Sequence, residues 1–379
     1  MLREARRRIR RGARRTRGEV RVTVRFVMTM LLVAAALPCA AAAQGSAAPD
    51  TLPISIRLDT GEADAALAIL ARRARGDSAR AEDWERLFES EGYRRLRDRE
   101  ASMGRAFEDA TMRAFLEADS MAVRSGALAE TVARWRSVDV TDAARRAFAY
   151  LPAGTTIRAT VYLVIKPRSN SFVFDLRGDP AIFLYVDPSI PPERLANTVA
   201  HELHHVGFAR ACQGAADTTL TEAQRGLRDW MGAFGEGVAV LAAAGGPLEP
   251  PDTTWTAADR DEWGRDLADL TPAMVRLEDF FIAIAEGAPA ESDSIVARGM
   301  AFFGNRGLWY TVGYVMARAV ERAFGRERLI ASLCDMRDLV RAYQTAVRLR
   351  LRGSQWLAAL PQWSDRLMDA LGGTSHPRN

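Results

Sequence analysis

Three of the four histidines in this chain lie within one five-residue segment, His201-Glu202-Leu203-His204-His205. In this segment His201, Glu202 and His205 form the pattern His-Glu-x-x-His. Residues four apart on an α-helix are only about 40° apart around its axis, so the two imidazoles would project side by side and could bind one ion. The pattern therefore demands a helix with one face left free, which constrains the surrounding fold.

The residues around this segment favour such a helix. A Pro-Pro pair at residues 191–192 stands where a helix would begin, because proline is well suited to a first helical turn. An apolar stripe lies roughly 110 to 150° around the axis from the two histidines, so the helix can bury that side and leave the histidines facing a cleft. The stripe consists of Leu195, Val199, Leu203 and Val206.

A zinc ion bound by two histidines needs a third protein ligand, which leaves the fourth position for water. The one remaining histidine, His376, stands near the C-terminus, so a carboxylate is the simplest third ligand. The acidic residues that follow the histidines include Asp217, Glu222, Asp229, Glu236 and Glu249.

Glu236 is distinguished among these acids by its surroundings. Residues 225–244 predict one helix with an apolar stripe, and Glu236 points away from that stripe. The residues on its own side are small, which permits the close approach of another helix. A glutamate there would be an uncompensated buried charge unless something cationic meets it. The alternative is a partly exposed glutamate at the edge of a helix packing surface.

The positive charge of the chain is concentrated at its start. The net charge is +4, but residues 3–25 hold eleven arginines and two acids, a local net of +9, so the rest carries 4 − 9 = −5. An apolar run from Phe26 to Leu37 follows, and then the small-residue pattern Ala41-x-Ala43. This order is typical of a secretory signal peptide. We therefore expect an exported protein, periplasmic or secreted, that contacts a membrane only through an uncleaved leader. The acidic remainder argues against nucleic-acid binding.

The rest of the chain predicts a mostly helical α+β protein. We expect a signal peptide (1–43), a linker (44–60), a helical N-terminal region (61–151), a metal-binding core (152–245) and a helical C-terminal region (246–372). Three β-branched and aromatic segments at 156–165, 171–175 and 181–186 predict a three-stranded meander beside the histidine helix. Cys212 and Cys334 would remain after cleavage, either as a disulfide or as two buried thiols.

The His201–His205 motif followed by Gly235-Glu236-Gly-Val-Ala resembles the gluzincin class of zinc metallopeptidases. The segments Trp84–Tyr93 and Trp309–Ala317 are also similar to a bacterial family of predicted zinc-dependent peptidases of unassigned function, and this similarity spans about residues 60–350. It implies a gluzincin-like fold with Zn²⁺ held by His201, His205 and Glu236. The strand Ala181–Val186 resembles the edge strand on which gluzincins align peptide substrates, and the alternative is a plain core strand.

One position departs from this class. Thermolysin-like enzymes carry an aspartate four residues after the ligand glutamate to orient a histidine, whereas this chain has Val240. Any orienting group must come from elsewhere, and Asn197 and Glu222 are the candidates.

The resemblance and the residues imply the same reaction, hydrolysis of a peptide or protein substrate. Glu202 would take a proton from the zinc-bound water and pass it to the leaving amine. Tyr310, Tyr314 and His204 are the candidates to donate a hydrogen bond to the developing oxyanion. Two other functions stay open: an inactive, zinc-stabilised peptide-binding or scaffold protein, and a zinc hydrolase of another amide or ester. Cleavage specificity and oligomeric state cannot be read from the sequence.

Overall fold

The computed structural model describes residues 53–372 except 106, 213–218, 248–250, 252–253, 305–306 and 350–354. The expected signal peptide therefore lies outside the described residues, as do Asp217, Glu249 and His376. None of the helices in the described part has the length and apolar character of a membrane span.

Within the described residues, four strands form one sheet in the order β1-β2-β4-β3. These are β1 (Ile54–Asp59), β2 (Ile157–Val164), β3 (Phe172–Phe174) and β4 (Ala181–Tyr185). β1, β2 and β4 run parallel, and β3 pairs antiparallel with β4. The three segments predicted as strands are strands, but the predicted three-stranded meander is wrong, because β2 and β4 are parallel neighbours and β1 adds a fourth strand.

Two further corrections follow from this topology. Residues 54–59, expected to belong to a linker, pair along β2 over their whole length. Their alternation of half-buried Ile54, Ile56 and Leu58 with polar residues suits an edge strand. The strand Ala181–Val186, expected at the edge, contains β4, which lies between β2 and β3. The edge strand on that side of the sheet is β3.

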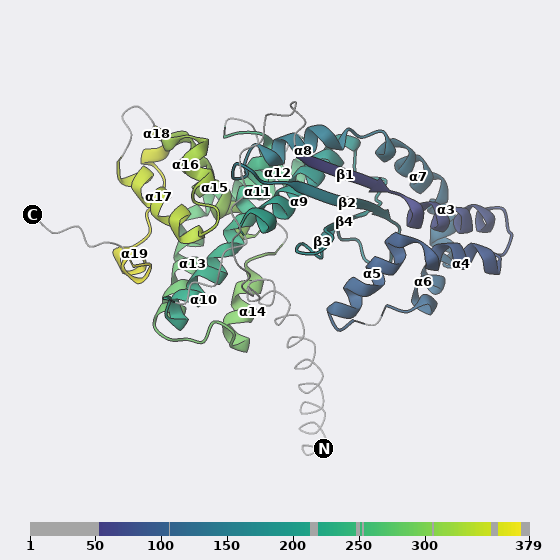
Figure 1. Ribbon diagram of the computed structural model, residues 1–379, viewed down its shortest axis with the longest axis horizontal. Coiled ribbons are helices and arrows are strands. Elements are labelled where there is room, and N and C mark those ends of the chain that lie inside the picture. Colours follow the sequence, from purple (N-terminus) through teal and green to yellow (C-terminus); the bar gives the residue numbers. More distant parts are fainter. Residues whose placement is uncertain are drawn as a thin grey trace, which may run out of the picture.

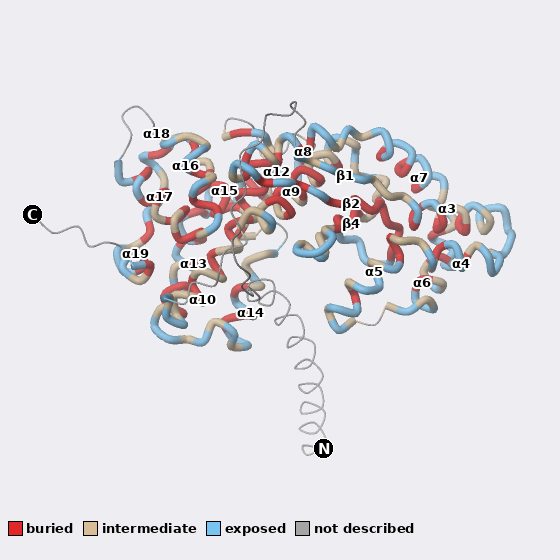
Figure 2. The backbone as a smooth tube through the Cα atoms, in the orientation of Figure 1, coloured by how far each residue is buried: buried red, intermediate tan, exposed pale blue. Residues whose placement is uncertain are grey.

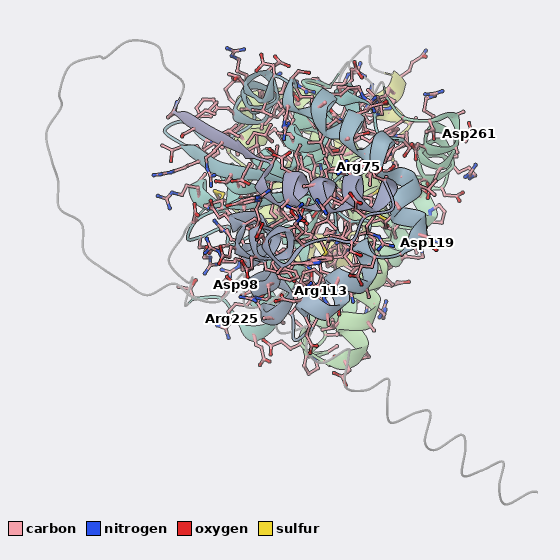
Figure 3. All side chains as sticks on the ribbon, turned by 90° about the vertical axis from the view of Figure 1, so that its right-hand side faces the viewer. Arg75, Asp98, Arg113, Asp119, Arg225 and Asp261 are labelled. Carbon is pink, nitrogen blue, oxygen red and sulfur yellow. A yellow bond between two sulfur atoms is a disulfide. The ribbon has the colours of Figure 1, made fainter. Side chains whose placement is uncertain are left out.

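Six helices lie between β1 and β2 in the part of the N-terminal region that the structure describes. They are α3 (Gly61–Ala74), α4 (Ala81–Glu89), α5 (Glu91–Ser102), α6 (Asp109–Leu116), α7 (Asp119–Arg136) and α8 (Val140–Phe148). Apolar residues of α3, α7 and α8 form one core with one face of the sheet, whereas α5 covers part of the other face through Leu96. Figure 3 shows charged side chains such as Arg75, Asp98 and Arg113 around the outside of this region.

The helices after β4 form the other half of the molecule (Figure 1). They are α9 (Pro192–Ala211), α10 (Glu222–Met231), the 3₁₀ turn Gly232–Phe234, α11 (Gly235–Ala244), α12 (Ala257–Ala268), α13 (Leu270–Ala285), α14 (Asp293–Ala301), α15 (Leu308–Phe324), α16 (Arg326–Ile330), α17 (Met336–Arg348), α18 (Gln355–Ala358) and α19 (Asp365–Ala370). The single helix expected over 225–244 is thus interrupted by a 3₁₀ turn. Buried backbone is concentrated around α9, α11 and α15 and in the strands beside α9 (Figure 2).

A disulfide joins Cys212 to Cys334, with a Cα–Cα distance of 5.0 Å. Of the two alternatives that the sequence left open, the structure therefore has the disulfide. Cys212 directly follows the last residue of α9, and Cys334 stands between α16 and α17. The cross-link consequently fixes the C-terminal end of the histidine helix to the C-terminal region.

Candidate metal centre

The helix α9 presents the histidine pair as its sequence pattern predicts. It begins at Pro192, and Leu195, Val199 and Leu203 are buried in the core shared with the sheet. The opposite side of the helix carries the two histidines, whose side chains are 17 % and 19 % exposed at His201 and His205. The imidazoles are therefore accessible yet held on a well-packed helix.

Three ligand atoms from two helices converge at this site. The Nε2 atoms of His201 and His205 are 3.1 Å apart, and the Glu236 Oε2 atom lies 3.1 Å from the first and 3.2 Å from the second. These three residues form the one group of metal-ligating side chains found among the described residues. The structure thus brings together all three residues that the sequence predicts as ligands.

The dimensions of this triangle suit a zinc ion. The centre of a triangle with sides of 3.1, 3.1 and 3.2 Å lies about 1.8 Å from each corner. A point at the zinc–ligand distance of about 2.0 to 2.2 Å therefore exists just outside the plane of the three atoms. Two imidazole nitrogens and one carboxylate oxygen also match the three protein ligands of a catalytic zinc site.

A crossing of two glycines places Glu236 opposite the histidines. Gly237 on α11 lies against Gly313 on α15, and a Cβ added at Gly237 would stand 2.1 Å from the backbone nitrogen of Tyr314. A Cβ added at Gly313 would stand 2.7 Å from the Phe234 carbonyl oxygen. Only residues without a side chain allow the two backbones to approach so closely. The predicted partner helix for the small-residue surface of α11 is therefore α15.

Of the two candidate tyrosines, Tyr310 lies at the site. Its ring stacks on His201 with centroids 6.2 Å apart and an interplanar angle of 15°. Burial, the charges of Glu236 and Glu202 and a hydrogen bond to Glu236 all raise the pKa of Tyr310, so its hydroxyl stays protonated. Tyr314 is 1 % exposed in the core, with its ring 5.4 Å from that of Trp263.

The third candidate donor, His204, lies in the core beside the site. It is 1 % exposed, its ring stacks on Phe208, and neither ring nitrogen has a hydrogen-bond partner. Burial and the neighbouring histidines lower the pKa of His204 to about 3, so this imidazole is neutral. Because His204 is buried in the core, Tyr310 is the better candidate for the donor.

The electrostatics of the protein alone already favour a cation between the ligands. Burial is the largest single effect and opposes charge at both His205 and Glu236, but the charge attractions and hydrogen bonds among the histidines and carboxylates together outweigh it. They raise the pKa of His205 to about 9 and lower the pKa of Glu236. Burial raises the pKa of Glu202, with a further contribution from the charge of Glu236 and a partial offset from the two histidines. Without a metal, a proton on His205 therefore fills the electrostatic role of the ion.

The two residues expected to orient the histidines, Asn197 and Glu222, have no hydrogen bond to either histidine among the described residues. Asn197 accepts a 3.1 Å hydrogen bond from Arg146, and Glu222 is exposed in the first turn of α10. Arg146, on α8, also donates to the carbonyl of Ala243 near the end of α11. This arginine connects both metal-site helices to α8. Sequence reasoning missed it, because nothing marks one arginine among so many.

The fold and the site define a mostly helical α+β protein with a His/His/Glu arrangement suited to zinc. A family model described as "Putative zinc dependent peptidase (DUF5700)" matches residues 84–350, and the chain belongs to this family. The predicted resemblance to a family of zinc-dependent peptidases is thereby confirmed, and Zn²⁺ is the metal that the family implies. No curated protein and no solved structure matches the chain.

Proposed function

We propose that this protein is an exported, gluzincin-like zinc peptidase that hydrolyses peptide bonds by means of His201, His205, Glu236 and Glu202. The observation that carries the proposal is the triangle of ligand atoms, each side 3.1 to 3.2 Å, with Glu202 directly after the first ligand. The signal-peptide pattern of residues 1–43 supports export.

Zinc bound by these three side chains would lower the pKa of a coordinated water and polarise the carbonyl of the scissile bond. The Glu202 carboxylate would accept the proton of the attacking water and deliver it to the leaving amine. Its raised pKa suits this task, because a carboxylate that is harder to ionise binds a proton more readily. Tyr310 would donate its hydroxyl hydrogen to the developing oxyanion, since it stacks on His201 and remains protonated.

The sheet offers a binding surface for an extended peptide. β3 is an edge strand, and α9 contacts it directly. The outer backbone groups of such a strand can pair with an added peptide strand by main-chain hydrogen bonds. We propose that β3, rather than β4, aligns the substrate.

The test is a comparison of the mature chain with Glu202→Gln. Both proteins are analysed for bound zinc and incubated with a peptide library whose products are identified by mass spectrometry. We expect about one zinc per chain in both, chelator-sensitive cleavage by the wild type, and a loss of at least about 10²-fold in Glu202→Gln. Unchanged hydrolysis in the zinc-loaded variant would refute the mechanism. A zinc-loaded wild type that cleaves no peptide would refute the proposed function, and parallel ester and non-peptide amide libraries would then test the remaining hydrolase alternative.

A further inference from the structure

The first residue of β3, Phe172, is an aromatic side chain with two cationic groups beside its ring. Phe172 stacks on Phe183 of β4, with centroids 5.1 Å apart. The guanidinium of Arg99, on α5, lies 3.9 Å from the centre of the Phe172 ring, and the ammonium of Lys166 lies 5.4 Å from it. Contacts of this kind hold the cationic groups beside the first residue of the edge strand.

Positive charge exceeds negative charge in this cluster, which we define as Arg99, Glu100, Arg105, Lys166 and Arg168. Glu100 is shared, since Arg99 and Arg105 each approach its carboxylate to 2.5 Å. Arg168 is exposed on the loop between β2 and β3. The cluster therefore carries four cations and one anion, a net charge of 4 − 1 = +3.

Lys166 is the only lysine of the chain and is 3 % exposed. Its ammonium donates to the Arg168 carbonyl and, at 2.7 Å, to the Asn170 Oδ1 atom, both of which are uncharged acceptors. Burial lowers the pKa of Lys166 to about 8; Arg99 and Arg168 contribute in the same direction, and the charges of Glu100 and Glu62 offset part of this effect. A buried ammonium without a carboxylate in contact is costly unless an anion compensates it.

The opposite end of β3 carries acidic side chains that the Phe172 end lacks. Arg95, on α5, forms ion pairs with Asp175, at 3.7 Å, and with Asp179. Arg158 and Arg210 line a cavity together with Asp179. Arginines near this end therefore have two carboxylates beside them, whereas the four cations near Phe172 share one, that of Glu100.

The metal centre lies toward the Phe174 end of β3. α9 begins seven residues after β4 ends, and its later residues Val206 and Arg210 line a cavity of about 950 Å³ together with Asp179 and Pro180, just before β4. α9 therefore runs back along β4. His201 and His205 stand in the middle and later part of α9, so the Phe172 end of β3 extends away from the metal centre toward the start of this helix.

An extended peptide gains slightly more from antiparallel than from parallel pairing with β3. In that direction its C-terminal part lies at the Phe172 end, where the excess of positive charge would also attract its terminal carboxylate. We infer that the cluster Arg99–Arg105–Lys166–Arg168 recognises a carboxylate on the C-terminal side of the scissile bond. The carboxylate is either an acidic side chain or the free C-terminus of the substrate. This inference rests on the proposed peptidase function.

The test measures kcat/KM on matched peptides that carry Glu, Gln or Lys at the second and third positions after the scissile bond, each with a free or an amidated C-terminus. We expect the wild type to prefer Glu to Gln, or the free to the amidated terminus, by at least about fivefold, and this preference to shrink in 0.5 M salt. A preference for Glu identifies a side-chain carboxylate as the recognised group. A preference for the free terminus identifies the C-terminus.

The decisive variant is Arg168→Glu, whose side chain is exposed and whose folding is checked by zinc content and circular dichroism. We expect it to reduce the preference, measured as the ratio of kcat/KM on the charged and neutral peptides, to about twofold or less. The matched control is Arg86→Glu on α4, which lies away from β3 (Figure 1) and should keep the full preference. Equal rates on all charges and both termini in the wild type, or a full preference in Arg168→Glu, would overturn the inference and leave the peptidase function standing. Absence of cleavage of every peptide would instead overturn the peptidase function, and the inference with it.

Discussion

Replacement of Gly313 by alanine tests how the two halves of the metal centre are held together. The added Cβ would stand 2.7 Å from the Phe234 carbonyl oxygen and 3.2 Å from the Gly237 Cα atom, whereas ordinary contact begins at 3.4 Å. Both neighbours are backbone atoms that cannot rotate away. The α11 and α15 backbones must therefore separate locally by about 3.4 − 2.7 = 0.7 Å.

This displacement is large compared with what a zinc site tolerates. Ligand distances in a working site stay within about 0.2 Å of their ideal values, and Glu236 is the residue next to Gly237. We expect Gly313→Ala to weaken zinc binding by about 10- to 100-fold and to lower the unfolding free energy by about 1 to 3 kcal/mol.

The assay is competition for zinc with a fluorescent chelator, combined with urea unfolding of the zinc-free protein. The matched control is Gly264→Ala on α12, where an added Cβ meets nothing within 4 Å. That substitution should keep zinc affinity and slightly raise stability, because alanine is the better helix former. Wild-type zinc affinity in Gly313→Ala would show that the glycine crossing does not position Glu236.

Three further predictions concern the same site and its support. Tyr310→Phe should keep zinc and lower kcat by about 10²- to 10³-fold through loss of the donor, whereas Tyr314→Phe, in the core, should leave kcat unchanged; equal effects of the two would contradict the assignment of Tyr310. The pKa of His205 is raised to about 9, so zinc must displace a proton from this side chain. Zinc affinity should therefore increase by up to about tenfold per pH unit from pH 6.5 toward 9, and the zinc-free protein should lose stability over the same range as that proton leaves. Calorimetry of zinc binding in buffers of different ionisation enthalpy should show proton release, and proton uptake or no proton exchange would contradict this prediction. The double substitution Cys212→Ser and Cys334→Ser removes a disulfide between residues 122 apart in sequence. It should lower the unfolding free energy by about 3 to 5 kcal/mol. An unchanged midpoint of urea unfolding would show that the disulfide contributes no stability.

The parts of the site that depend on local periodicity could be predicted from the sequence. The start of α9 at Pro192 follows from the preference of proline for a first helical turn, and its buried stripe follows from apolar residues about one helical turn apart. The small residues around Glu236 likewise predicted a closely packed helix, although they could not say which one. The choice between Tyr310 and Tyr314 depends on which turn of α15 faces the site, and this is decided by the contact between Gly237 and Gly313.

The parts that depend on distant pairing could not be predicted. β1 pairs with β2 about one hundred residues later, and its short alternating pattern follows an Ala/Pro/Ser/Thr-rich stretch that is typical of a linker. Three strands that follow one another in sequence can pair in that order or with the last strand in the middle, and the sequence pattern is the same in both cases. Only the structure shows that β4 pairs with β2 and that β3 is at the edge. Arg146, which links α8 to the site helices, carries no sequence signal among the many arginines.

The most direct test of the central claim is an anomalous-difference map from crystals of the zinc-loaded mature chain, recorded on both sides of the zinc absorption edge. We predict one strong peak at about 2.0 to 2.2 Å from the His201 Nε2, His205 Nε2 and Glu236 Oε2 atoms, and the loss of this peak in Glu236→Ala. A peak held by other residues, or an undiminished peak in Glu236→Ala, would contradict the proposed metal centre.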